Sequence, residues 1–279
     1  MILRKTPEEI EKIAAAGEVV VATLRLLERM VRAGVTTEEM DAAAEKMIRS
    51  RGGVPTFKGY RGFPASICAS PNSMIVHGIP GPYALERGDV ISLDVGVTLD
   101  GWVADAARTF AVGSPGVLVR NLLDGTRDAL FAGIEHAAPG NRLGDVSHAI
   151  QHVAESRGLA VVRTLVGHGV GRDMHEDPQI PNFGEPGTGP ELEEGMVLAI
   201  EPMTTARGVS RYASNSATAA RRRLRSTAAI RSMRQCSACF SISPSISLTR
   251  SVATRNKSSA NPRTSALAVP CSAQNVRRT

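Results

Sequence analysis

The last part of this 279-residue chain contains no acidic residue. Residues 204–279 hold 13 Arg, one Lys and 15 Ser but no Asp or Glu, where average composition predicts about nine acidic residues. The preceding part is acidic, with 27 Asp and Glu against 19 Lys and Arg, so the net charge of +6 describes neither part. We therefore divide the chain into a body, 1–204, and a basic, acid-free tail, 205–279. The apolar residues of the tail follow no helix or strand period, which predicts disorder.

The body also lacks disulfides and long apolar runs. Its single cysteine, Cys68, excludes a disulfide framework within the body. No run approaches the 18 apolar residues typical of a transmembrane helix, and charged residues follow directly on a short apolar start, unlike a signal peptide. We therefore expect a cytoplasmic protein without membrane contact. A monomer is expected as well.

Helix and strand signals in the body occur in the same order twice. Thr6 with Glu9, and Thr36 with Glu39, have the spacing of capping boxes, and Pro7 suits the first position of a helix. These two helices are expected to end by Gly34 and Gly52, and two more are predicted near 115–137 and 144–157. Strands are expected around 66–69, 74–77, 90–97, 109–112, 161–165 and 197–201. The buried side of the first helix is predicted to carry Ile10, Ile13, Ala14, Val20, Val21, Leu24 and Leu27.

The two halves also share a sequence pattern. "IVHGIPG" precedes "GDVISLDVG" in the first half, and "VGHGVGR" precedes "GMVLAIEP" in the second. Each time a His-Gly turn comes before an apolar strand that carries a carboxylate. This repetition, together with the element order, predicts an internal duplication with pseudo-two-fold symmetry.

Two carboxylates interrupt apolar segments of the first half. Asp94 lies within "VISLDVGV", and Asp105 follows the turn predicted at Asp100-Gly101. A hairpin centred on that turn would place both on neighbouring strands. Buried carboxylates need compensation, which a divalent metal can supply. The alternative is that one or both simply accept hydrogen bonds from a turn or pair with Arg.

The second half offers a matching set of donors. Glu201 ends the apolar segment "GMVLAI", and His168 lies between glycines that allow the backbone to bend closely around a ligand. His175 follows in "RDMHEDP". A single histidine is more often structural, but carboxylates with one imidazole suit Mn, Fe, Co or Zn better than Mg or Ca. The remaining histidines on predicted helices are expected to be solvated: His136, His148 and His152.

Five motifs of the body together resemble the type I methionine aminopeptidases: "NSMIVHGIP", "SLDVG", "DGWVADAARTF", "GHGVGRDMHEDP" and "LAIEPM". The resemblance runs in order over about residues 1–203. It implies an α/β (α+β) pita-bread fold of two pseudo-symmetric halves around a two-metal site. It also implies removal of initiator methionine from the N-termini of nascent peptides, with the ribosome as a further candidate partner.

The resemblance implies roles for individual residues. Asp94 resembles a ligand of one metal, Asp105 the bridge between both, and His168 and Glu201 ligands of the other. Glu201 would also move a proton while a metal-activated water attacks the peptide carbonyl. The two non-ligand histidines near the scissile amide are expected to be His77 and His175. The methionine side-chain pocket is expected to include Tyr60, Phe63 and Cys68, and Met174 stands where the family often has an aromatic pocket residue.

The family pattern has a second bridging Glu on a final strand, and this chain has no acidic residue after Glu201. We therefore expect the final strands to be missing or replaced, one metal in place of two, and impaired activity. The tail has two interpretations, an out-of-frame translation product or a basic arm that grips ribosomal RNA. Two alternative functions follow: an inactive pita-bread protein that binds ribosome or RNA through its tail, and a related proline dipeptidase.

Overall fold

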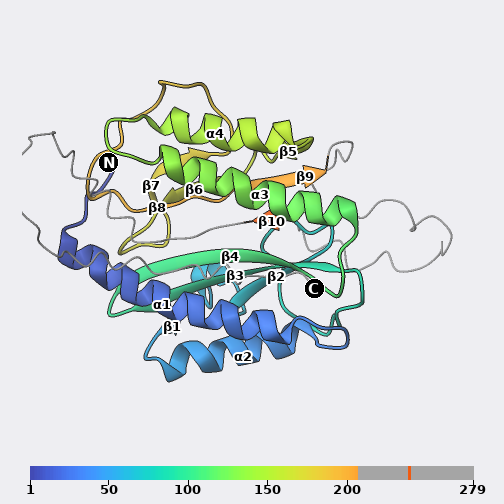
Figure 1. The fold of residues 1–279 in the computed structure, drawn as a ribbon. Coiled ribbons are helices and arrows are strands. Elements are labelled where there is room, and N and C mark those ends of the chain that lie inside the picture. The colour runs from blue at the N-terminus through green and yellow to red at the C-terminus, as the bar shows by residue number, and fades with distance from the viewer. Residues whose placement is uncertain (207–237, 240–279) are drawn as a thin grey trace, which may run out of the picture. The chain divides into compact units, whose positions relative to one another are not determined.

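The structure, a computed structural model, describes residues 1–206 and 238–239 (Figure 1). Two helix pairs organise the described chain, α1 (Pro7–Met30) with α2 (Thr37–Ser50), and α3 (Val117–His136) with α4 (Leu143–Ser156). Both predicted capping boxes are present, with Thr6 Oγ1 accepting from the Glu9 amide at 3.3 Å and Thr36 Oγ1 from the Glu39 amide at 3.1 Å. The four expected helices are therefore confirmed.

A four-stranded antiparallel sheet follows the first helix pair, and β3 (Val90–Leu99) is its central strand. β4 (Trp102–Ala111) pairs along one edge of β3, while β2 (Ile67–Pro71) and β1 (Val54–Pro55) pair along the other. The β3–β4 hairpin turns at Asp100 and Gly101, whose φ values are 50° and 76°. Positive φ at both positions is the geometry of a type I′ hairpin turn, which an Asp-Gly pair favours. The predicted hairpin is thus confirmed.

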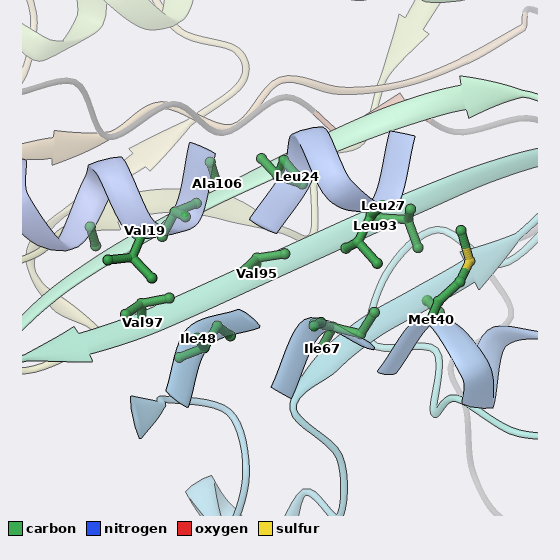
Figure 2. Close-up of a cluster of buried hydrophobic side chains, with 14 of the residues drawn as sticks. Val19, Leu24, Leu27, Met40, Ile48, Ile67, Leu93, Val95, Val97 and Ala106 are labelled. Carbon is green, nitrogen blue, oxygen red and sulfur yellow. The ribbon is translucent and has the colours of Figure 1, made fainter. Parts of the chain in front are cut away.

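The strand period decides which side chains of β3 enter the core. Leu93, Val95 and Val97 point toward α1 and α2 and pack with residues such as Leu27 and Ile48 (Figure 2). Alternate residues of a strand lie on opposite faces, so Asp94 is on the face away from these helices. The apolar core therefore holds the hairpin from one side and leaves its polar positions for the other.

The second half builds two small antiparallel sheets beside α3 and α4. One has the order β7-β6-β8, from β6 (Val166–Gly169), β7 (Glu176–Pro181) and β8 (Leu198–Ala199). The other has the order β10-β9-β5, from β5 (Leu159–Val161), β9 (Met203–Ala206) and β10 (Ala238–Cys239). A single turn of 3₁₀-helix, η1 (Tyr60–Gly62), lies between β1 and β2. The described chain thus has the repeated helix-pair-and-strands arrangement expected of a pita-bread fold.

Several local predictions were wrong. Residues 74–77 form no strand, because the chain turns there: His77 has φ 59°, and the Gly78 carbonyl accepts the amide of Ala69. Of the strand expected at 161–165 only Val161 lies in a strand, because β5 ends there and β6 begins at Val166. Val21 is 43% exposed, and Val19 takes its place in the core, as the 3.6-residue period through Ile13 and Ala16 requires.

Most of the tail lies outside the described residues, and so do its expected disorder and the two interpretations of its origin. Within the described part, β9 continues to Ala206, past the boundary expected at residue 204, and pairs antiparallel with β5 and β10. The sequence did not predict β10. No helix among the described residues is long and apolar enough to cross a membrane.

Candidate metal centre

Strands from both halves bring four predicted donors to one place. Asp105 lies opposite Gly96 in the β3–β4 register and Asp94 opposite Ala107, so both carboxylates are on the same face of the hairpin. His168 comes from the middle of β6, and Glu201 follows β8, which pairs with β6. One ligand atom each of Asp105, His168 and Glu201 lie within 4.8 Å of one another. Asp94 is not in this three-residue set, but it lines the same cavity.

The imidazole of His168 is held in an orientation that suits a metal ligand. Its Nδ1 lies 2.9 Å from the Gly169 carbonyl, and because a carbonyl can only accept, Nδ1 carries a proton. Nε2 faces the carboxylates instead, 3.0 Å from Glu201 Oε1 and 3.6 Å from Asp105 Oδ2. Metal-binding histidines commonly use one nitrogen for the ion and donate from the other to a carbonyl or carboxylate.

The charge balance of this cluster also favours a bound cation. Burial, together with the charges of Glu201 and Asp105, raises the pKa of Asp94 well above its usual value. Burial raises the pKa of Asp105 to about 7, although His168 opposes that rise. Burial lowers the pKa of His168, but the hydrogen bond with Glu201 and the charge of Asp105 outweigh it, so that the pKa is raised to about 9. A proton thus offsets the carboxylates where a divalent ion would do so more fully.

One buried atom tests the fit of a metal directly. Asp105 is 3% exposed, and its Oδ1 has no hydrogen-bond partner. An orphaned carboxylate oxygen is costly, and a cation satisfies it without a hydrogen-bond donor. Oxygen and imidazole ligands together are the set expected for Mn, Fe, Co or Zn. The residues present therefore fit a divalent transition-metal ion.

The glycines that flank His168 serve strand packing. A Cβ on Gly167 would lie 2.3 Å from the Ala199 carbonyl oxygen, and one on Gly169 would lie 2.2 Å from the Asp177 carbonyl oxygen. Neither distance is compatible with a side chain. Both glycines let neighbouring backbone approach β6 closely, which places His168 beside the segment that carries Glu201.

A cavity of about 590 Å³ opens over these donors. Its lining includes every predicted site residue, and the structure therefore brings the whole set together: Tyr60, Phe63, Cys68, His77, Asp94, Asp105, His168, Met174, His175 and Glu201. The wall also contains apolar residues that the sequence did not single out, among them Phe57, Val76, Ile79, Leu165 and Met203. Nothing in their sequence pattern distinguished them from core residues, because a pocket wall and a core require the same apolar side chains.

His175 lies at the junction of the donors and the pocket. Its ring centroid is 4.4 Å from that of His168, and its Nδ1 is 2.9 Å from the Tyr60 hydroxyl. Burial lowers the pKa of His175 to about 4, and the neighbouring charge of His168 adds to the effect. His175 is therefore a neutral imidazole near neutral pH, able to donate one hydrogen bond and accept another.

Cys68 and His77 reach the cavity from the first half. Cys68 lies opposite Asp94 in the β2–β3 register, and burial beside Asp94 raises the pKa of its thiol well above the usual value. The thiol is therefore a neutral wall group at physiological pH. His77 reaches the cavity from a left-handed backbone position, with φ 59°. The three other body histidines named above are exposed, as expected.

A duplicated pita-bread fold with a carboxylate-and-imidazole cluster between its halves defines a metal-dependent hydrolase. The model of metallopeptidase family M24 matches residues 11–231. The methionine aminopeptidase of Clostridium acetobutylicum is 51% identical over 204 residues, which cover 73% of this chain and 82% of the relative. This chain belongs to metallopeptidase family M24.

Solved structures agree with this assignment. The methionine aminopeptidase of Thermotoga maritima superposes with a TM-score of 0.78 at 39% identity, covering 86% of this chain and 94% of that one. The prolidase of Pyrococcus furiosus superposes with a TM-score of 0.62 at 27% identity, covering 72% of this chain and 57% of that one.

Proposed function

We propose that this chain is a methionyl aminopeptidase, a metal-dependent exopeptidase that removes the N-terminal methionine from nascent proteins. The observation that carries the proposal is the set Asp105, His168 and Glu201, with the orphaned Asp105 oxygen, at an apolar cavity of about 590 Å³. These three side chains would hold one ion. Asp94 would hold a second ion with Asp105, but the chain has no later carboxylate to complete that site. We therefore propose one Co, Mn, Fe or Zn ion per chain and an activity lower than that of relatives with two.

The chemistry divides among few side chains. A divalent ion, when bound, supplies a Lewis acid that activates water and offsets negative charge. Glu201 takes the proton of the attacking water and returns it to the leaving amine. His175 donates a hydrogen bond to the oxygen of the scissile carbonyl as negative charge develops on it. His77 hydrogen-bonds the peptide beyond the cleaved bond.

Tyr60 sets the tautomer of His175 in this scheme. A phenol hydroxyl that donates to Nδ1 leaves the single proton of a neutral imidazole on Nε2. His175 can then act as a donor toward the substrate. The lowered pKa of His175 supports this role, because a cationic ring beside a metal ion would be repelled.

The wall of the cavity suits an unbranched apolar side chain. Phe63, Met174 and Cys68 line it together with the ring of Tyr60. Met174 is itself a flexible thioether, and thioethers make favourable contacts with aromatic rings and adapt to irregular walls. The burial of a methionine side chain here would contribute about 2 kcal/mol to substrate binding.

Similarity favours this function over proline dipeptidase activity. The Thermotoga methionine aminopeptidase is 39% identical and superposes with a TM-score of 0.78, whereas the Pyrococcus prolidase is 27% identical and superposes with a TM-score of 0.62. The curated Clostridium acetobutylicum relative, at 51% identity, is also a methionine aminopeptidase.

Peptide cleavage tests the proposal. The purified chain, loaded with Co or Mn, is expected to release methionine from Met-Ala-Ser and to leave Ala-Pro intact. His168→Ala should abolish release, and His148→Ala, on the exposed face of α4, should not. Cleavage of Ala-Pro in preference to Met-Ala-Ser would indicate a dipeptidase. Tight metal binding without cleavage of either peptide would indicate a binding protein.

A further inference from the structure

A buried ion pair lies directly behind the cavity histidine. Lys5 Nζ is 2.5 Å from Glu176 Oε2, and the two side chains are only 4% and 5% exposed. Glu176 follows His175 in the chain and begins β7. Two buried charges cost desolvation energy that only their pairing offsets. Removal of either partner leaves an unpaired buried charge and destabilises the fold strongly. Neither residue lines the cavity, and the proposed reaction gives neither a role.

Glu176 uses its other oxygen to hold the segment that carries His175. Oε1 accepts the backbone amides of Arg172 at 2.8 Å and Asp173 at 3.2 Å. The carboxylate therefore closes residues 171–176 into a loop fastened at both ends. The start of the loop is fixed as well, because the Val103 amide of β4 donates to the Gly171 carbonyl at 2.8 Å.

Lys5 packs into this loop with no spare space. A Cβ on Gly171 would lie 2.5 Å from Lys5 Cε and 2.7 Å from Glu176 Oε1, so any side chain there would displace the ion pair. The backbone amide of Lys5 donates to the Gly195 carbonyl at 2.7 Å, which anchors the residue from the other side. The segment before α1, from the first half, thus reaches the loop of the second half that carries His175.

We propose that Lys5 is a positioning residue for His175. Lys5 holds the Glu176 carboxylate, the carboxylate holds the amides of the loop, and the loop places His175 between His168 and Tyr60. The inference rests on the proposed function for its kinetic consequence, because His175 is assigned there to the scissile carbonyl. Its structural part, the fastening of loop 171–176 by Lys5, can be measured without any activity.

Amide hydrogen exchange by NMR is the first test. Lys5→Met keeps the length and apolar stem of the side chain but removes the charge, and the exchange of the Arg172 and Asp173 amides should accelerate at least tenfold. Arg4→Met is the matched control, since Arg4 makes an exposed ion pair with Glu193, with side chains 59% and 51% exposed. In that variant the two loop amides should exchange as in the unmodified chain, and the amides of β3 should be unchanged in both.

Kinetics on the Co-loaded protein is the second test. Lys5→Met should lower kcat for Met-Ala-Ser about ten- to a hundredfold, since small misplacements of a catalytic group carry costs of this size, while KM changes less than threefold. The double variant Lys5→Met/Glu176→Gln should recover much of kcat. Glutamine keeps the oxygen that accepts both loop amides, and the buried charge left unpaired by Lys5→Met is removed. A residue that mattered for stability alone would lower the melting temperature and leave kcat of the folded fraction unchanged.

The two proposals fail separately. If the unmodified chain cleaves no peptide but Lys5→Met accelerates exchange at Arg172 and Asp173, the proposed function is wrong and the fastening of the loop stands. If the chain is active and Lys5→Met leaves both the exchange rates and kcat unchanged, the positioning role is overturned. If the exchange rates of the Arg172 and Asp173 amides stay unchanged and kcat falls no further than it does in Arg4→Met, the positioning role is overturned as well.

Discussion

At the scale of single residues, the metal centre places charge where the fold alone would not tolerate it. Asp105 is buried with an orphaned oxygen, and its pKa is raised to about 7 because burial disfavours the charged form. A carboxyl group with such a raised pKa weakens the metal-free fold progressively as the pH rises from the unfolded value of 3.8 to about 7, because the unfolded chain ionises first. The site thus opposes stability until a cation compensates it, as expected of a group retained for its chemistry.

Asp105→Asn separates these two effects. The amide has the same shape without charge, so we expect the metal-free protein to gain about 1 kcal/mol in its free energy of unfolding at neutral pH. Co or Mn affinity should fall on the order of a hundredfold or more. Urea denaturation in EDTA and isothermal titration calorimetry measure the two. Asp100→Asn, in the exposed hairpin turn where Asn is also favoured, should change neither. Unaltered metal affinity in Asp105→Asn would contradict the assignment.

Tyr60→Phe tests the proposed tautomer of His175. The phenyl ring keeps the pocket wall and loses only the hydroxyl that lies 2.9 Å from Nδ1. We expect kcat for Met-Ala-Ser to fall about tenfold, because the imidazole proton then divides between two nitrogens and the ring loses a fixed orientation. Tyr83→Phe removes a hydroxyl that donates to Asp89 outside the cavity, and it should leave kcat unchanged. Equal kinetics in the two variants would argue against the role of Tyr60.

At the scale of elements, close backbone approach is what joins the donors of the second half. β6 can lie against β8 only because Gly167 has no side chain, since a Cβ would meet the Ala199 carbonyl at 2.3 Å. Gly167→Ala should therefore lower the free energy of unfolding by about 2 kcal/mol and weaken metal binding, as β8 and Glu201 move away. Gly116→Ala, before α3, has open space at that position and should be nearly neutral. Full metal affinity in Gly167→Ala would show that the strand spacing does not control the site. Chemical denaturation and calorimetry provide both readings.

The element α2 is joined to the pocket side of the first half through Glu45. Its carboxylate accepts from Lys58 at 2.7 Å, Arg49 at 2.9 Å and Ser66 at 3.2 Å. The hydrogen bond from Lys58, followed by that from Arg49, lowers the pKa of Glu45 from 4.5 to about 2. Because folding lowers its pKa, the ionised Glu45 carboxylate stabilises the fold at pH values above its unfolded pKa of 4.5. This contribution is lost as the pH falls toward 2.

The loss of stability caused by Glu45→Gln is expected to depend on pH over this same range. The variant should be about 1 kcal/mol less stable than the unmodified chain at neutral pH, a modest figure because the group is partly solvated. The difference should shrink steadily below the unfolded pKa of 4.5. Urea denaturation over this range measures it. Lys58→Met, which removes the main cause of the shift, should show much of the same pH dependence. A difference that stays constant with pH would contradict the assignment.

At the scale of the whole molecule, the absence of acidic residues after Glu201 limits the metal count. Asp105, His168 and Glu201 form one complete donor set, whereas Asp94 has only the shared Asp105 beside it. Calorimetric titration with Co should therefore saturate at one tightly bound ion per chain, and metal analysis after dialysis should give the same ratio. Two tight ions would mean that a donor outside the described residues completes the second site.

The division of the chain into an acidic body and a basic tail also belongs to this scale. We propose the body as the catalytic part and an out-of-frame origin for residues after about 204, because one event would explain the missing carboxylate and the abrupt change in composition together. The nucleotide sequence tests this interpretation: another reading frame should encode a strand-turn-strand pattern that contains Glu. A frame without one would favour a basic arm.

Much of the architecture could be predicted because its causes are local. Capping boxes at Thr6 and Thr36 mark where helices begin, and Asp100-Gly101 selects a hairpin turn whatever surrounds it. The donors could be singled out because a charged residue at the end of an apolar strand is chemically unusual. The wrong prediction of a strand at 74–77 shows where local signals no longer suffice. His77 has a left-handed backbone next to Gly78, whose carbonyl accepts the Ala69 amide of β2, and this contact joins residues that are not adjacent in the sequence.

The sequence by itself determined the helices, the hairpin, the duplicated order of elements and the identity of the polar groups that needed a partner. Only the tertiary structure decided that Asp105, His168 and Glu201 meet, that Tyr60 reaches His175, and that Lys5 is buried against Glu176. The reason is physical: periodicity and caps act over a few residues, whereas these distances depend on how closely two halves can pack. That closeness is controlled by glycines and buried charges, whose partners are visible only once the chain has folded.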